Sequence, residues 1–133
     1  MNAEVYASLV ALQDVRRAGW RIVVAKFARR PRGQGNPVEV EFDWRAVYRL
    51  EDRTGAVVGF YHTHPEGMAD MSGTDEKTMR GWTASLGKPL LCVIRSGDEV
   101  VAWEFVPGRR TRRAQAATIC RGVVVAVIRH ARG

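Results

Sequence analysis

The feature that most constrains the fold is the run AVVGFYHTH at residues 56–64, which is followed directly by Pro65. Its β-branched and aromatic residues favour a buried strand, and the proline ends that strand because it has no amide hydrogen to donate to a neighbour. Alternate side chains of a strand project from the same face, so His62 and His64 point together. Two of the chain's three histidines therefore meet at the end of an apolar strand, which indicates a metal site.

A carboxylate that can complete this site follows the second histidine after ten intervening residues. Ser72, Asp75 and Glu76 have the pattern of a helix start, because serine caps the first turn and the positive end of the helix dipole favours acids. The loop before them lets Asp75 return to the histidines. Two imidazoles and one carboxylate are three ligands of a tetrahedral zinc site whose open fourth position is typical of catalytic zinc. Taken singly, the histidines fit a surface pair and Asp75 a helix cap; together, and with Pro65, they favour the metal.

The remaining patterns predict an α/β fold with a mixed β-sheet flanked by helices, in a single domain over residues 1–133. The segment 29–37 carries prolines and glycines and is expected to be a loop within that domain. Period-two or strongly apolar runs predict strands, and the residues at 112–120 favour a further helix. Expected strands are residues 4–12, 20–27, 38–43, 56–64, 89–94, 99–106 and 122–129, with the polar residues 13–19 joining the first two; expected helices are 44–52 and 72–86.

Composition and charge limit the class of protein without identifying its partner. The 133 residues contain no apolar run long enough to cross a bilayer, and the N-terminus lacks the pattern of a secretion signal, so we expect a cytoplasmic protein. Cys92 and Cys120 belong to no paired motif and are expected to be free thiols. The net charge of +7 is carried largely by arginines at 29–32 and 109–113. These clusters fit a solubilising surface, an acidic protein partner or nucleic acid.

The histidine and aspartate residues also carry a family resemblance. His62, Thr63, His64 and Pro65, followed after six residues by Ser72 and after two more by Asp75, resemble the H-[S/T]-H-P-x6-S-x2-D signature of the JAMM (MPN-plus) metalloproteases. The resemblance covers about residues 4–105 and implies a JAMM/MPN-like domain, similar to the cytidine-deaminase sandwich. It implies one Zn²⁺ held by both histidines and the aspartate, with the serine hydroxyl stabilising the oxyanion of the reaction.

The family also requires a glutamate upstream, as the acid that takes a proton from water. Glu4 begins EVYASLVAL, which is similar to the family's E-x-x-[G/A]-x-L-x-[G/A] strand, with Ala7 and Ala11 at the positions of small residues. Glu4 is therefore the first choice. Glu39 and Glu41 remain alternatives, although no small residues follow them in the same pattern. Glu66, beside the HTHP motif, is at a position where the family has no catalytic group.

JAMM proteases cleave isopeptide bonds at the C-terminus of ubiquitin and ubiquitin-like proteins. Only short connections are expected between Asp75 and Phe105, so the chain resembles the small bacterial relatives, which process or remove ubiquitin-like proteins beside activating and conjugating enzymes. We expect a zinc isopeptidase of this kind, with no membrane partner. The alternatives are a JAMM-like peptidase for another purpose such as phage tail assembly, a non-haem iron site, and a non-catalytic basic module that binds protein or nucleic acid.

Overall fold

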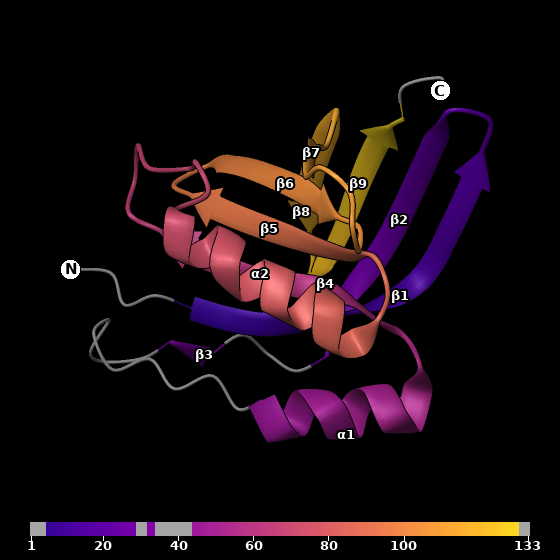
Figure 1. Ribbon diagram of the computed structural model, residues 1–133. Coiled ribbons are helices and arrows are strands. Elements are labelled where there is room, and N and C mark those ends of the chain that lie inside the picture. The colour runs from indigo at the N-terminus through magenta and orange to yellow at the C-terminus, as the bar shows by residue number, and fades with distance from the viewer. Residues whose placement is uncertain (1–4, 29–31, 34–43, 131–133) are drawn as a thin grey trace.

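The computed structural model describes residues 5–28, 32–33 and 44–130, and Figure 1 shows their arrangement. The elements in chain order are β1 (Val5–Arg17), β2 (Trp20–Phe27), β3 (Arg32–Gly33), α1 (Trp44–Thr54), β4 (Val57–His64), α2 (Gly73–Leu86), β5 (Leu90–Ser96), β6 (Glu99–Phe105), β7 (Arg112–Arg113), β8 (Ala116–Cys120) and β9 (Val123–Arg129). Within these ranges, no helix is long and apolar enough to span a membrane. The predicted α/β class is confirmed.

The strands form one mixed sheet in the order β7-β6-β5-β4-β1-β2-β9-β8, with β3 paired to the start of β1. The pair β4–β5 is parallel, and the other described pairs are antiparallel. Parallel neighbours need a crossover connection, and α2 provides it. The loop that leads into α2 starts at the end of β4, so the helix begins near His62 and His64.

Both helices pack on one face of the central strands (Figure 1). Val47 of α1 and Met79 of α2 are buried against apolar side chains of β4, β5 and β6. The helix α2 has a complete N-terminal cap: Ser72 Oγ accepts the Asp75 amide, and the Asp75 carboxylate accepts the Ser72 amide. At its other end Gly87 adopts φ 67°, a left-handed conformation that glycine tolerates best. The sheet and these caps fix the start of α2 beside β4.

The sheet curls, so that its opposite face encloses a second core. Between β7 and β8, the Ala114 amide donates to Ala102 O at 2.8 Å and the Gln115 amide donates to Val127 O at 2.7 Å. This segment therefore joins β6, near one end of the strand order, to β9, near the other. The enclosed core consists mainly of the inward side chains of β1, β2, β4, β5 and β9, among them Leu9, Val23, Ala25, Leu91, Val93, Val124 and Ile128.

A buried ion network lies inside the curl. Arg21 of β2 is 1% exposed and donates to Glu104 of β6 at 2.9 Å and to Asp14 of β1 at 2.7 Å and 2.9 Å. His130 Nε2 lies 2.9 Å from the other oxygen of Glu104. Burial lowers the pKa of Arg21, but its hydrogen bonds to Asp14 and Glu104 outweigh this and raise the pKa above its ordinary value. The network thus joins strands from both halves of the curled sheet. His130, the one histidine outside the HTHP motif, belongs to it.

Most expected elements are confirmed with shifted ends. The predicted helices at 44–52 and 72–86 correspond to α1 and α2, and the strands at 56–64, 89–94, 99–106 and 122–129 correspond to β4, β5, β6 and β9. The expected strand at 38–43 lies outside the described residues. Cys92 and Cys120 are both free thiols, one buried and one exposed.

Two predictions are wrong. Residues 112–120 do not form a helix, because their backbone pairs with β6 and then with β9, and Ala117 and Ile119 turn inward at a strand's period of two. The edge offered by β9 stabilises this segment as strands. The polar residues 13–17 are not a connection either. They continue β1 as far as Arg17, after a bulge between Ala11 and Gln13, and pair with β2.

Candidate metal centre

The two histidines of the site lie at the end of the central strand β4. This strand pairs with β1 on one side and with β5 on the other, so its backbone is held from both edges. His62 is 7% exposed, and its ring stacks on that of Tyr6 in β1, with centroids 5.5 Å apart and planes 10° from parallel. The ring of His64 lies 4.8 Å from that of His62, and their Nε2 atoms are 3.0 Å apart.

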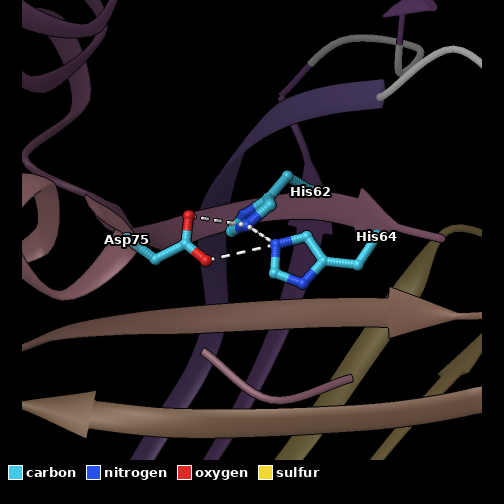
Figure 2. A group of neighbouring side chains, drawn as sticks. All are labelled: His62, His64 and Asp75. Atoms are coloured by element: carbon cyan, nitrogen blue, oxygen red, sulfur yellow. Dashed lines mark hydrogen bonds and ion pairs between the residues drawn. The ribbon is translucent and has the colours of Figure 1, made fainter. Parts of the chain in front are cut away.

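Asp75 reaches the histidines from the first turn of α2, as Figure 2 shows. Its Oδ1 lies 3.1 Å from His62 Nε2, and its Oδ2 lies 3.1 Å from His64 Nε2. Burial raises the pKa of this carboxyl, but the hydrogen bond and charge of His62, with the Ser72 donors, outweigh burial and hold the pKa far below its ordinary value. The carboxylate is therefore ionised at neutral pH and is oriented by the helix cap.

The loop between β4 and α2 determines which nitrogen of His64 carries hydrogen. His64 Nδ1 lies 2.8 Å from Met68 O, and a carbonyl oxygen only accepts, so Nδ1 must be the protonated atom. The lone pair of a neutral ring then belongs to Nε2, which faces His62 and Asp75. A donor on the distal nitrogen is the usual arrangement of a metal-binding histidine.

Ser96 holds this loop in place. It is the last residue of β5, is 3% exposed and lies opposite His64 in the parallel register. Its Oγ donates to Pro65 O at 2.6 Å and accepts the Met68 amide at 3.2 Å. The serine therefore anchors Met68, the residue whose carbonyl orients His64. The sequence does not identify this residue, which lies just beyond the expected strand 89–94.

The three side chains fit a metal ion. Their ligand atoms all lie within 4.8 Å of one another, and the closest pairs are 3.0 and 3.1 Å apart. Tetrahedral zinc with bonds of about 2.0–2.1 Å places its ligand atoms roughly 3.3 Å apart, only slightly farther. A lone pair of His64 Nε2 faces a carboxylate and a second imidazole nitrogen. A cation between these atoms would reduce the repulsion between their lone pairs. Among the described residues, His62, His64 and Asp75 are the one such group.

The other predicted residues are Ser72 and four glutamates. Ser72 is the exposed N-cap of α2, one turn from Asp75. Glu4, Glu39 and Glu41 lie outside the described residues. Glu66 is exposed and its side chain lies against Gly97, so it is not one of the clustered ligands.

The fold and this site define an α/β protein with a three-ligand candidate metal centre at the end of its central strand. A family model described as "Prokaryotic homologs of the JAB domain" matches residues 5–106. The chain belongs to this family, and the resemblance to JAMM proteins is confirmed. The matched range includes His62, His64 and Asp75, whereas β8 and β9 lie beyond it. Among curated proteins, no match to the chain is found.

Proposed function

We propose that this protein is a zinc-dependent JAMM-type peptidase that cleaves after the C-terminal tail of a ubiquitin-like protein. One observation carries the proposal: in a chain of the JAB family, His62, His64 and Asp75 bring their ligand atoms within 4.8 Å of one another. Their distances fit tetrahedral zinc, and three protein ligands leave a fourth position for chemistry. The expected cytoplasmic location remains part of this proposal.

Zinc at this position supplies a Lewis acid that polarises a carbonyl and makes water a better nucleophile at neutral pH. The chain's own residues would donate the hydrogen bond to the reacting carbonyl and transfer the proton of the attacking water. Ser72 Oγ already accepts the Asp75 amide, so its hydroxyl hydrogen can donate to the carbonyl oxygen as negative charge develops there. The side chain of Ser72 is exposed, which leaves it accessible to a substrate.

We assign the role of general base to Glu4. The described part of β1 begins at the next residue, and Tyr6 pairs with His62 and stacks on its ring. This register supports Glu4 over Glu39 and Glu41 because it brings the start of β1 to the metal centre. Glu4 would accept a proton from the attacking water and pass it to the departing lysine or α-amine.

The short connections around the site support a substrate with a flexible tail. Residues 87–89 join α2 to β5, and a two-residue turn joins β5 to β6. No inserted segment between Asp75 and Phe105 is present to hold a second folded protein. A glycine-rich C-terminus suits such a site because it allows close approach of the backbone. We propose precursor processing or deconjugation in a bacterial pathway that also contains activating and conjugating enzymes.

The test is cleavage of a ubiquitin-like protein fused through a Gly-Gly tail to a reporter, together with metal analysis. We expect about one zinc per chain and cleavage that a chelator stops and zinc restores. Glu4→Gln should lower kcat by about 10²- to 10⁴-fold without loss of zinc, and His62→Ala should lose both zinc and activity. The matched control Glu66→Gln changes an exposed acid near the site and should keep full activity.

Three results would contradict the proposal in different ways. Wild-type activity in Glu4→Gln would show that another acid is the general base. Iron in place of zinc would favour a non-haem iron site. Stoichiometric zinc without cleavage of any tail fusion would remove ubiquitin-like proteins as substrates while leaving the metal centre intact.

A further inference from the structure

The strand β9 carries apolar side chains on both faces. A sheet with one face in water normally alternates apolar and polar residues, whereas a strand covered on both faces is apolar throughout. The β9 sequence VVVAVIR has no such alternation. Val124, Ala126 and Ile128 point into the enclosed core, so Val125 and Val127 point outward, away from it.

The cross-strand register aligns these outward residues with others on β1 and β2. Val127 lies opposite Ile22, which lies opposite Val15, and Val125 lies opposite Val24. Ile22 is 40% exposed, Val15 and Trp20 are each 38% exposed, and Leu12 in the β1 bulge is 52% exposed. We call this set the bare sheet face; it consists of Leu12, Val15, Trp20, Ile22, Val24, Val125 and Val127.

No described element covers this face. The buried contacts of α1 and α2 are with β4, β5 and β6, and in Figure 1 β2 and β9 extend beyond both helices. Gln13, opposite Val24, is an exposed polar residue on the same face. Apolar side chains gathered and exposed on one face in this way mark sites of interaction. The face therefore has the composition of a protein interface.

The charges around the face select its partner. Arg17 and Arg129 lie on either side of Trp20 in the register, with the Arg129 guanidinium 5.6 Å from the indole, and Lys26 lies opposite Val123. Among the described residues of β1, β2, β8 and β9 the one acid is Asp14, and it is turned inward to Arg21. A second copy of this chain would bring like charges together, whereas carboxylates would pair with them. We propose that the bare sheet face binds an acidic protein whose apolar side chains are bordered by Asp or Glu.

This surface is separate from the metal centre. Tyr6, at the start of β1, pairs with His62, whereas Val15 is nine residues further along the same strand, about 30 Å at 3.3 Å per residue. A protein bound at the bare sheet face leaves the metal centre open. The bare sheet face can therefore bind its partner while the metal centre is occupied, and this binding does not depend on the proposed peptidase activity.

The test uses defined peptides of about ten residues, the length of a long strand, in which leucine alternates with glutamate, lysine or serine. Fluorescence anisotropy should show the glutamate peptide binding at least about tenfold more tightly than the lysine peptide, with affinity falling as salt is added. Ile22→Ser and Arg17→Glu should each weaken this binding by about tenfold or more. Trp44→Ser and Arg110→Glu make the same kinds of change at exposed residues elsewhere and should leave it unchanged. Thermal unfolding checks that every variant is folded.

Cys120 offers a second, direct measurement. It is exposed, lies opposite Val123 on β9 and points outward, since its neighbour Ile119 packs into the core. Cys92 is 1% exposed and burial raises its pKa to about 12, so a maleimide reacts with Cys120 alone. The glutamate peptide should slow this labelling in the wild type and not in Ile22→Ser.

Several outcomes would overturn the proposal. It fails if the lysine or serine peptide binds as well as the glutamate peptide, if none binds, or if Trp44→Ser weakens binding as much as Ile22→Ser. A dimer in analytical ultracentrifugation that Ile22→Ser converts to a monomer would assign the face to a second copy of the chain. None of these results depends on zinc or on cleavage, so the proposed function is tested separately.

Discussion

Adding a single methyl group at Gly59 should strongly lower the stability of the protein. Gly59 lies in β4 directly opposite Leu91 of the parallel strand β5. A Cβ at this position would lie 2.3 Å from Leu91 O and 2.8 Å from Leu91 N, whereas ordinary contact begins at 3.4 Å. Gly59→Ala therefore requires the two strands to separate by about 1 Å, and the atoms in the way are backbone atoms that have no alternative rotamer.

The expected loss of stability follows from this displacement. Overpacking a rigid interior typically costs about 1–3 kcal/mol, and weakening one neighbouring backbone hydrogen bond adds about 1 kcal/mol. Alanine also restricts the unfolded chain, which returns about 0.4–1 kcal/mol. We expect Gly59→Ala to lower the free energy of unfolding by about 2–3 kcal/mol and the Tm by roughly 10 °C. Zinc affinity should fall as well, because His62 and His64 follow on the same strand.

Urea and thermal unfolding, followed by circular dichroism, measure the stability loss, and the matched control is Gly81→Ala. Gly81 lies within α2 with no atom within 4 Å of the added methyl group. In an exposed helix, alanine is favoured over glycine by about 1 kcal/mol, so the same substitution should stabilise the protein there. A Gly59→Ala protein that unfolds at the wild-type temperature would refute the close approach of β4 and β5.

The remaining predictions concern the side chains around the metal centre. Ser96→Ala should weaken zinc binding by about 10- to 100-fold, because the loop that orients His64 loses its tether; isothermal titration should show partial recovery in Ser96→Thr, and wild-type affinity in the alanine variant would exclude the tether. Ser72→Gly should lower kcat by about 10²- to 10³-fold yet lower stability by only a few tenths of a kcal/mol, because glycine is a tolerable N-cap. Equal kcat in wild type and variant would remove Ser72 from catalysis. In the metal-free protein, Asp75 has a lower pKa folded than unfolded, so its contribution to stability is complete above its ordinary value of 3.8 and is lost as the pH falls through the folded pKa. Urea unfolding between neutral and acidic pH should therefore show a steeper acid loss in the wild type than in Asp75→Asn, and parallel curves would contradict this shift.

The clustering of His62, His64 and Asp75 could be predicted from the sequence because local rules place these residues. The strand period of two brings His62 and His64 to one face, and the serine that caps α2 aims Asp75 at them. Their support could not be predicted in the same way. Ser96 acts on Pro65 across 31 residues of sequence, through a parallel register that no local pattern encodes.

The structure of the C-terminal segment also depends on long-range contacts that no local pattern predicts. Residues 112–120 have no strong local preference, and they form strands because β6 and β9 offer them unpaired edges. Which face of each strand turns inward also depends on contacts between residues far apart in the sequence. Strand pattern shows which residues share a face, but the identity of the inward face depends on what lies across the curl.

The strand β2 makes this dependence explicit. One face of its sequence carries Trp20, Ile22 and Val24, and the other carries Arg21 followed by Val23 and Ala25. Hydrophobicity alone favours burying the first face, yet the structure turns the arginine face into the core. A register slip of one residue would invert the two faces.

The ion network accounts for the orientation that the structure adopts. The Glu104 carboxylate is 2% exposed and accepts hydrogen bonds from Arg21 and His130. Inverting β2 would therefore leave a buried carboxylate without its arginine. Breaking a buried ion pair on one side typically costs about 3–5 kcal/mol. Each half-exposed apolar side chain would gain roughly 1–2 kcal/mol by full burial, but Val23 and Ala25, both 0% exposed, would turn outward and offset much of that gain. The network thus holds Trp20 and Ile22 at the surface. Their exposure is a consequence of specific inward contacts, and an acidic partner at the bare sheet face would recover the hydrophobic burial that the isolated chain forgoes.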